Sequence, residues 1–238
     1  MSRWYESPYD RAYMEIYLIR HGEPEWVRDG LNVVDPPLTE RGRRQSQRIA
    51  SALADVHFDE VVVSPLQRAG QTAAPLLAAL GREPMVEPWL QEIREPDWHG
   101  TPAEMAAKAY ADDRARPAAE RWNGVEGGEP PIEFVERVRA GGADFLAARG
   151  IYRSRQILPV WHMDASDARI AVFAHSGTNG VLLCQFLGLD PVPWEWDRFV
   201  TNHASITRVE TMQLGDGHTF SLARLSDVEH LDQADRTR

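Results

Sequence analysis

Three short apolar segments alternate with helix-like segments, and this order limits the folds open to the chain. The apolar segments lie at residues 16–19, 60–63 and 169–174. Short uninterrupted apolar runs of this kind are typical of strands that are covered on both faces. Strands that alternate with helices form a mostly parallel sheet with helices on both sides. We therefore predict an α/β fold, a three-layer α/β/α sandwich around such a sheet.

Helix and turn signals separate these strands. Thr39 is a suitable N-cap for the first helix, and Gly81 is placed to end the second, which contains Pro75 as an expected kink. The remaining pattern predicts helices over residues 131–149 and 178–188, and a closing hairpin of strands over 202–210 and 218–225.

The length of 238 residues suits one domain. Residues 83–150 interrupt the strand–helix alternation with several tryptophans, many alanines and a glycine- and proline-rich loop. We interpret this region as an insertion or lid within a single domain that spans 1–238.

Charge and cysteine content narrow the range of partners. Thirty-six acidic residues against 26 basic ones give a net charge of −10, which opposes non-specific binding to nucleic acid. Cys184 is the single cysteine, so no internal disulfide is expected, and no apolar run approaches the ~20 residues of a membrane helix. We expect a cytoplasmic protein with no nucleic-acid or membrane partner; a homo-oligomer remains open.

Each predicted strand releases a basic side chain at its carboxyl end. Arg20 and His21 follow the first strand, Arg68 follows the second by a short turn, and His175 ends the third. Ligands bind beyond the carboxyl ends of parallel strands, so we expect these four side chains to meet in one cleft.

Two guanidiniums and two imidazoles suit a phosphate dianion. Arginine offers forked donors to phosphate oxygens, and a neutral imidazole can attack phosphorus and carry the phosphoryl group. The leaving alkoxide then needs an acid, for which Glu92, Glu95 and Asp97 compete. This scheme needs no metal or other cofactor, and the sequence has no HExxH or CxxC spacing.

Five segments, in this order, resemble the histidine phosphatase superfamily of phosphoglycerate-mutase-like proteins. They are LIRHGEPEW, DPPLTERGRRQSQRIA, VVVSPLQRAGQTAAPL, LQEI and VFAHSGTNGVLLCQFLGL. The resemblance implies that His21 is the phosphorylated nucleophile and Glu92 the proton donor. It further implies that the transferring phosphoryl group is bound by Arg20, Arg68 and His175, with Ser176 beside them.

The chain departs from the family pattern on the substrate side. Many relatives have Thr at the position of Pro24, Asn at that of Val27 and Gly at that of Ser176. A serine at 176 keeps the backbone donor and adds a hydroxyl. We place four further residues in the substrate pocket: Glu23, Trp26, Trp98 and His203.

These features favour a metal-independent phosphomonoesterase that acts through phosphohistidine on a small phosphorylated metabolite. One alternative is a mutase, which usually has adjacent arginines in a longer insertion, whereas Arg114 and Arg116 are separated here. A second alternative is a non-catalytic phosphate-binding module. A third is a metal site built from His21, His99 and His175.

Overall fold

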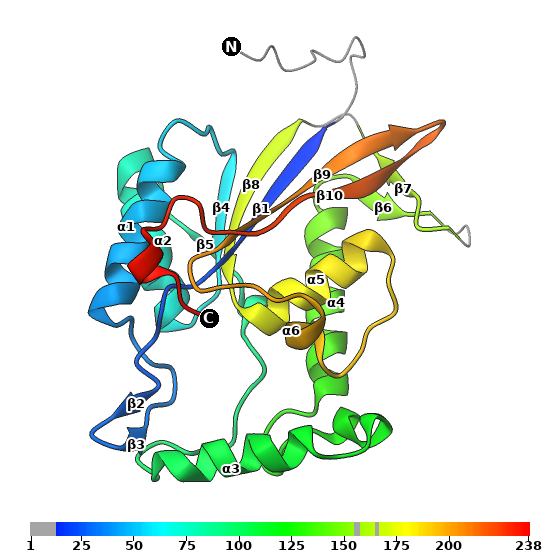
Figure 1. Ribbon diagram of the computed structural model, residues 1–238. Coiled ribbons are helices and arrows are strands. Elements are labelled where there is room, and N and C mark those ends of the chain that lie inside the picture. The colour runs from blue at the N-terminus through cyan, green and yellow to red at the C-terminus, as the bar shows by residue number, and fades with distance from the viewer. Residues whose placement is uncertain (1–12, 155–157, 165–166) are drawn as a thin grey trace.

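An eight-stranded sheet organises the computed structural model, which describes residues 13–154, 158–164 and 167–238. Figure 1 shows helices on both sides of this sheet. The strands are β1 Met14–Arg20, β2 Val27–Arg28, β3 Leu31–Asn32, β4 Glu60–Val63, β5 Met85–Val86, β6 Ile151–Arg153, β7 Trp161–Met163, β8 Ala168–Ala174, β9 Ile206–Leu214 and β10 Gly217–Asp227. The α-helices are α1 Glu40–Ala52, α2 Gln67–Leu80, α3 Ala103–Arg114, α4 Pro131–Ala147, α5 Ser176–Leu187 and α6 Glu195–Arg198. Short 3₁₀ helices are η1 Pro88–Leu90, η2 Ala118–Asn123 and η3 Gln233–Asp235.

The strand order is β5-β4-β8-β1-β9-β10-β7-β6. The first four of these strands run parallel, and the last four continue the sheet in antiparallel pairs. The α/β sandwich predicted from the sequence is confirmed, and so is the closing hairpin, formed by β9 and β10. The parallel half carries all three of the strands whose ends were expected to form the site.

Alternate side chains of β1 enter two separate cores, one on each face of the sheet. Ile16 and Leu18 pack with α4 and α5, while Tyr17 and Ile19 pack with α1 and α2. This period of two is the geometry of an extended strand. Every residue from 14 to 19 is consequently buried, which explains why the sequence shows an apolar run without polar alternation.

The expected helix ends are present. Thr39 caps α1 by accepting the amide hydrogen of Gly42 at 3.0 Å, and Gly81 ends α2 in the left-handed conformation at φ 62°. Pro75 lies inside α2, which continues to Leu80. No helix among residues 13–154, 158–164 and 167–238 combines the length and apolar character needed to cross a membrane.

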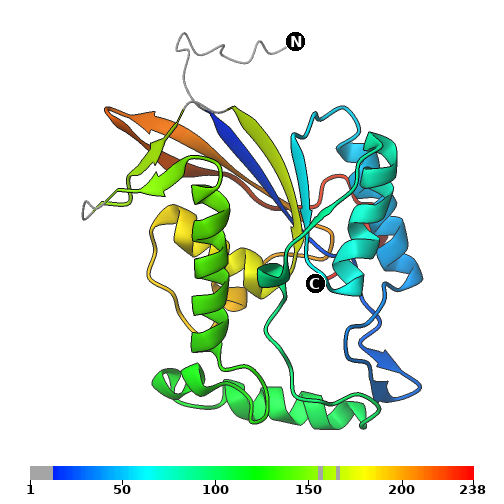
Figure 2. The same ribbon diagram turned by 180° about the vertical axis from the view of Figure 1, so that it is seen from behind.

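The expected insertion at residues 83–150 is narrower than its predicted bounds. Strand β5 pairs with β4 at the sheet edge, and Phe134, Val138 and Leu146 of α4 belong to the core, so both ends of the region are part of the body. Figures 1 and 2 show that α3 and η2 form an arm across the open end of the sheet. The β2–β3 hairpin anchors the start of this arm, where Asn32 donates its backbone amide hydrogen to Thr101 O at 2.8 Å. The carboxyl ends of β1, β4 and β8 face the space that the arm covers.

Candidate active site

The four basic side chains expected to converge do lie together. The imidazole rings of His21 and His175 are 5.2 Å apart between centroids, and Arg20 and Arg68 both act electrostatically on each ring. His21 is 2% exposed, His175 is fully buried and Arg68 is 3% exposed. Electrostatic interactions here are stronger than at the surface because water is largely excluded.

His21 is held in one tautomer. Its Nδ1 lies 2.8 Å from the carbonyl oxygen of Gly22, and a carbonyl can only accept, so Nδ1 carries the proton and Nε2 keeps its lone pair. Burial, followed by the positive charge of Arg68, holds the pKa of His21 well below its usual range. The ring is therefore neutral near pH 7, with a lone pair available on Nε2.

Close backbone packing fixes the loop that carries His21. A Cβ on Gly22 would lie 2.7 Å from Gly42 O, and one on Gly42 would lie 2.2 Å from Glu23 O. Only hydrogen fits at either position. The first turn of α1 therefore supports the loop directly, which explains the glycine in the RHG sequence and the one in TERG.

His175 is oriented by a serine that the sequence analysis did not select. Its Nε2 lies 2.8 Å from Ser64 Oγ, at the end of β4. Burial, followed by Arg68, also holds the pKa of His175 well below its usual range. When Ser64 donates its hydroxyl hydrogen to Nε2, the ring proton resides on Nδ1. This Nδ1 has no hydrogen-bond partner within the described part of the chain.

Arg68 is buried and Arg20 is half-buried, and both have few carboxylate contacts. Arg20 donates from Nη1 to Thr201 O at 2.6 Å, and Arg68 lies 3.7 Å from Asp35 and 4.9 Å from the ring centre of Trp26. Desolvation lowers the pKa of Arg68 and lowers that of Arg20 to about 10. The Nε atoms of both side chains lack a partner among the described residues. Buried cations this poorly compensated favour an anion at their centre.

Glu92 faces this cluster. Its carboxylate oxygens accept the backbone amide hydrogens of Gly177 at 2.9 Å and Ile93 at 3.0 Å. Burial raises the pKa of Glu92, although Arg68 and Arg20 oppose the shift. A carboxyl group with a raised pKa is suited to donate a proton. The close approach to Gly177 explains the glycine there, since a Cβ would lie 2.5 Å from Glu92 Oε1.

A half-buried ion pair holds the backbone around Glu92. Arg137 of α4 pairs with Glu129 at 2.8 Å and also donates to the carbonyl oxygens of Trp89 and Gln91 at 3.0 and 3.1 Å. Glu129 in turn accepts the amide hydrogen of Arg94. Residues on both sides of Glu92 are thus fixed to α4, and this network is a second group that the sequence analysis did not select.

The competing acids are placed differently. Glu95 accepts a hydrogen bond from the Tyr110 hydroxyl, and Asp97 is exposed and does not line the cavity described below. Of the three carboxylates, Glu92 alone contacts the N-terminus of α5, directly after His175.

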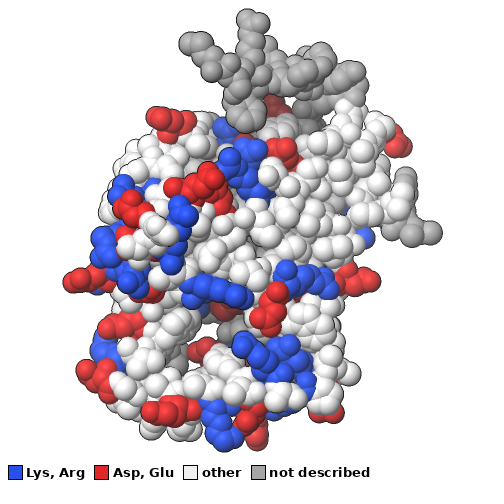
Figure 3. Space-filling view, viewed as in Figure 1, with Lys and Arg blue, Asp and Glu red and all other residues white. Residues whose placement is uncertain are grey.

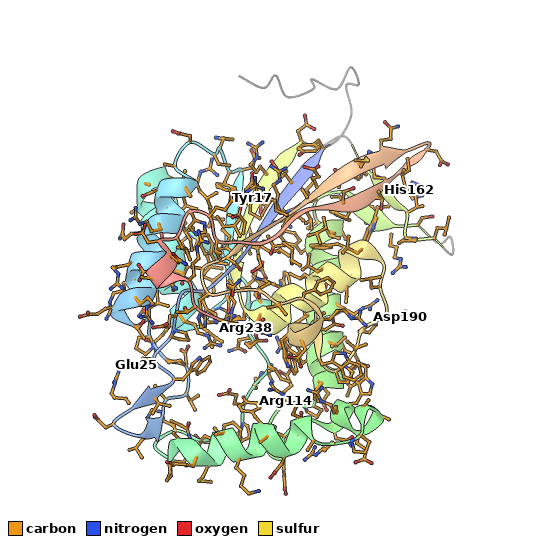
Figure 4. All side chains as sticks on the ribbon, viewed as in Figure 1. Tyr17, Glu25, Arg114, His162, Asp190 and Arg238 are labelled. Carbon is orange, nitrogen blue, oxygen red and sulfur yellow. The ribbon has the colours of Figure 1, made fainter. Side chains whose placement is uncertain are left out.

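A cavity of about 430 Å³ lies between these groups and the arm. Figure 3 shows this face hollowed between α3 and the body, and Figure 4 shows Arg114 on the side of α3 that faces the body. The catalytic side of the cavity is lined by Arg68, Glu92 and Ser176, whose Oγ lies 3.1 Å from Thr201 Oγ1. The opposite side is lined by residues that include Arg94, Tyr110, Asp113, Arg114 and Arg121.

Of the four residues predicted for the substrate pocket, only Trp26 lines the cavity. Glu23 does not line the cavity, and its carboxylate is bound to Thr39 and Arg41, each at 3.0 Å. Trp98 packs edge-on against Tyr110, at 5.5 Å between ring centres, and lines a second cavity of about 300 Å³ that shares Trp26 and Tyr110 with the first. The fourth, His203, contacts Arg20 and lies outside the cavity lining.

The structure gives no support to the metal-site alternative. His99 is exposed and contacts the backbone amide of Val34. Within the described ranges, no group of three or more His, Cys, Asp or Glu side chains is arranged to hold a metal ion.

Comparison with known proteins decides the family. Residues 16–225 match the model of the histidine phosphatase superfamily (branch 1). The matched range contains all the side chains of the site described above. The chain belongs to this superfamily. A curated relative named "Phosphoserine phosphatase 1", from Hydrogenobacter thermophilus, is 28% identical over 180 residues, covering 74% of this chain and 78% of the relative.

Other members resemble this chain over more of its length. "Probable phosphoglycerate mutase GpmB" from Escherichia fergusonii is 26% identical and covers 92% of this chain and 95% of its own. The solved structure of a mycobacterial glucosyl-3-phosphoglycerate phosphatase has a TM-score of 0.67 at 23% identity, over 91% of this chain and all of that one, which establishes a shared fold. Phosphatases and mutases are both among the relatives.

Proposed function

We propose that this protein is a metal-independent phosphomonoesterase that acts through a phosphohistidine on a small phosphorylated metabolite. One observation carries the proposal: Arg20 Nε, Arg68 Nε and His175 Nδ1 are buried and have no partner among the described residues, beside a neutral His21. Buried donors normally find acceptors. The oxygens of a phosphoryl group would satisfy all three, because they accept several hydrogen bonds at once.

The first chemical step forms a bond between His21 Nε2 and phosphorus while the ester P–O bond breaks. Arg20, Arg68 and His175 stabilise the negative charge on the phosphoryl oxygens, and Ser176 contributes from the start of α5. Glu92 donates its proton to the departing alkoxide. In the second step Glu92 takes a proton from water, the water oxygen attacks phosphorus, and the P–N bond breaks to release phosphate.

The cavity size and lining support a small substrate. A volume of about 430 Å³ falls in the range of small-molecule sites. Trp26 and Tyr110 offer flat apolar surfaces to the part of the substrate beyond the phosphate. Arg94 and Arg114 offer positive charge there, and neither takes part in an ion pair with another described residue.

A screen of phosphorylated metabolites, with p-nitrophenyl phosphate included, tests the proposal. We expect phosphate release from at least one compound in the presence of a metal chelator, and none above background from His21→Ala. Binding of phosphate by the wild type without any turnover would overturn the phosphatase assignment and favour a binding module.

A mutase is the second candidate, and one observation favours it. Arg114 and Arg121 both face the cavity, although the sequence separates them, and relatives named as phosphoglycerate mutases cover 92% of the chain. Arg121 is engaged by Asp113 and Trp194, whereas a bisphosphate site would need its charge free. Assay of the interconversion of 2- and 3-phosphoglycerate separates the two; transfer faster than hydrolysis would establish the mutase.

A further inference from the structure

His203 contacts Arg20 and does not line the cavity. Its Nε2 is 3.1 Å from Arg20 Nη2, and its ring centre is 5.7 Å from that of His21. A guanidinium can only donate, so this Nε2 must be an unprotonated acceptor. The neutral ring then carries its single proton on Nδ1, and this proton needs an acceptor of its own because His203 is 6% exposed.

Thr237 supplies that acceptor. His203 Nδ1 lies 3.0 Å from Thr237 Oγ1, and the backbone amide hydrogen of His203 bonds to Thr237 O at 3.0 Å. Burial, followed by the charge of Arg20, lowers the pKa of His203 to about 3, so the ring stays neutral across the physiological range. Loss of the Thr237 hydroxyl would leave the Nδ1 proton without a partner. The other tautomer would then turn an N–H towards Arg20, where two donors repel.

The chain end that carries Thr237 is fixed to the loop that carries His21. Gln45, which is fully buried, accepts the backbone amide hydrogen of Glu23 at 2.7 Å. Its Nε2 donates to Asp235 O at 2.6 Å and to Thr237 Oγ1 at 3.1 Å. Figure 4 shows Arg238, the next residue, near the carboxyl ends of the strands.

The backbone next to His203 is also fixed to the strand end that carries Arg20 and His21. Ala204 has φ 57°, a left-handed conformation that a residue with a Cβ rarely adopts. Its amide hydrogen bonds to His21 O at 3.0 Å, while Ser205 O accepts the amide hydrogen of Arg20 at 3.1 Å. Strained backbone of this kind persists where the surrounding contacts determine it, and it is concentrated at functional sites.

We propose that Thr237 and His203 are positioning residues for Arg20: Thr237 fixes the tautomer of His203, and His203 holds the Arg20 guanidinium in place for the phosphoryl group. The C-terminal segment 235–237 thereby belongs to the phosphate site without touching it. This inference rests on the proposed phosphoryl site, although it requires only that the site bind phosphate.

Calorimetric titration of the full chain with inorganic phosphate tests the coupling. We expect Thr237→Val to weaken phosphate binding about tenfold, the usual effect of a lost hydrogen bond near a charge, and Thr237→Ser to stay within about twofold of wild type. Asp232→Asn is the matched control, because it removes a surface ion pair of the same segment with Arg48. It should bind phosphate as the wild type does.

A double-mutant cycle distinguishes positioning from general support of the fold. If Thr237 acts through Arg20, Thr237→Val has no further effect on phosphate binding once Arg20→Gln is present. An equal loss in both backgrounds, or unaltered binding by a folded Thr237→Val, would overturn the proposal.

Nitrogen-15 NMR of the histidines tests the tautomer directly in the wild-type protein, with one variant used only for assignment. We expect His203 to show the Nδ1–H tautomer, assigned by loss of its signals in His203→Gln; the Nε2–H tautomer would overturn the proposal. A wild type that binds phosphate, shows this tautomer and hydrolyses nothing would contradict the phosphatase assignment alone.

Discussion

The two sides of the cavity are built differently. On the sheet side, His21, Arg68 and His175 are almost fully buried, and each is held by backbone, serine or aromatic contacts. On the arm side, Arg94 and Arg114 are exposed and have no ion-pair partner among the described residues. We infer that the sheet side determines the chemistry and the arm side determines which ester enters.

This contrast has a physical origin. The residues of the sheet side follow strands that are covered on both faces. A substitution there therefore disturbs a packed core as well as the site. The arm is attached through the β2–β3 hairpin and through segments that lead from Glu92 and into α4. Surface residues of this kind can change without loss of the fold. Changes on the sheet side should therefore lower kcat for every substrate, and changes on the arm should alter KM for particular ones.

The largest expected effect is on the sheet side. Arg68→Gln removes a buried positive charge that, in the proposed mechanism, contacts the phosphoryl oxygens. We expect kcat/KM for p-nitrophenyl phosphate to fall about 10³-fold. Arg43→Gln, an exposed arginine of α1, is the control and should leave kinetics unchanged. A drop of less than about tenfold in Arg68→Gln would remove the distinction between the two sides.

Glu92→Gln should have the next largest effect, about 10²-fold on kcat/KM for an alkyl phosphate, the parameter that reports the first step only. The loss should be smaller for p-nitrophenyl phosphate, whose leaving group needs no proton. Equal losses for both esters would contradict the role of Glu92 as acid.

The pH profile of the wild type follows from the same two groups. Activity requires neutral His21, and its lowered pKa keeps it neutral as the pH falls. Activity also requires protonated Glu92, so the rate declines as the pH rises through the raised pKa of that carboxyl. We expect an optimum on the acidic side of neutrality for alkyl phosphates, and loss of the alkaline decline in Glu92→Gln. A rate that rises steadily from acidic to alkaline pH would be inconsistent with these assignments.

A methyl group at Gly177 should have an intermediate effect. The new Cβ would lie 2.5 Å from Glu92 Oε1, so the carboxyl group must move, and we expect about a tenfold loss of kcat in Gly177→Ala. Gly70→Ala in α2 is matched to it, because nothing lies within 4 Å of the added Cβ. That control should keep full activity and gain up to about 1 kcal/mol in free energy of unfolding.

The smallest effect is predicted on the arm. Arg114→Ala should raise KM about threefold to tenfold for substrates with a second negative group, with kcat unchanged. No change is expected for p-nitrophenyl phosphate. Lys108→Ala on the same helix, which pairs with Asp112 and does not line the cavity, should behave as the wild type.

The residues on the sheet side were predicted well because each is marked by its immediate neighbours in the sequence. Basic residues directly follow the first and third apolar runs, and Arg68 follows the second after a short turn. Parallel strands bring their carboxyl ends together at one edge of the sheet. Thr39, Gly81 and Pro131 likewise mark helix ends through their own conformational preferences.

The remaining parts depend on contacts between distant residues. Ser64 orients His175 across 111 positions, and Thr237 contacts His203 across 34. Glu23 was predicted to lie in the pocket, but its carboxylate is bound to Thr39 and Arg41. Neither hydrophobic periodicity nor motif spacing predicts where a side chain in a loop will point.

Trapping the covalent intermediate tests the central claim most directly. The protein would be mixed with a ³²P-labelled phosphomonoester that it hydrolyses, quenched within milliseconds in alkali, and its labelled peptide identified by mass spectrometry. We predict an acid-labile, alkali-stable phosphoryl group on His21, absent from His21→Ala. An enzyme that releases phosphate at the wild-type rate without labelling His21, or with the label on another residue, would contradict it.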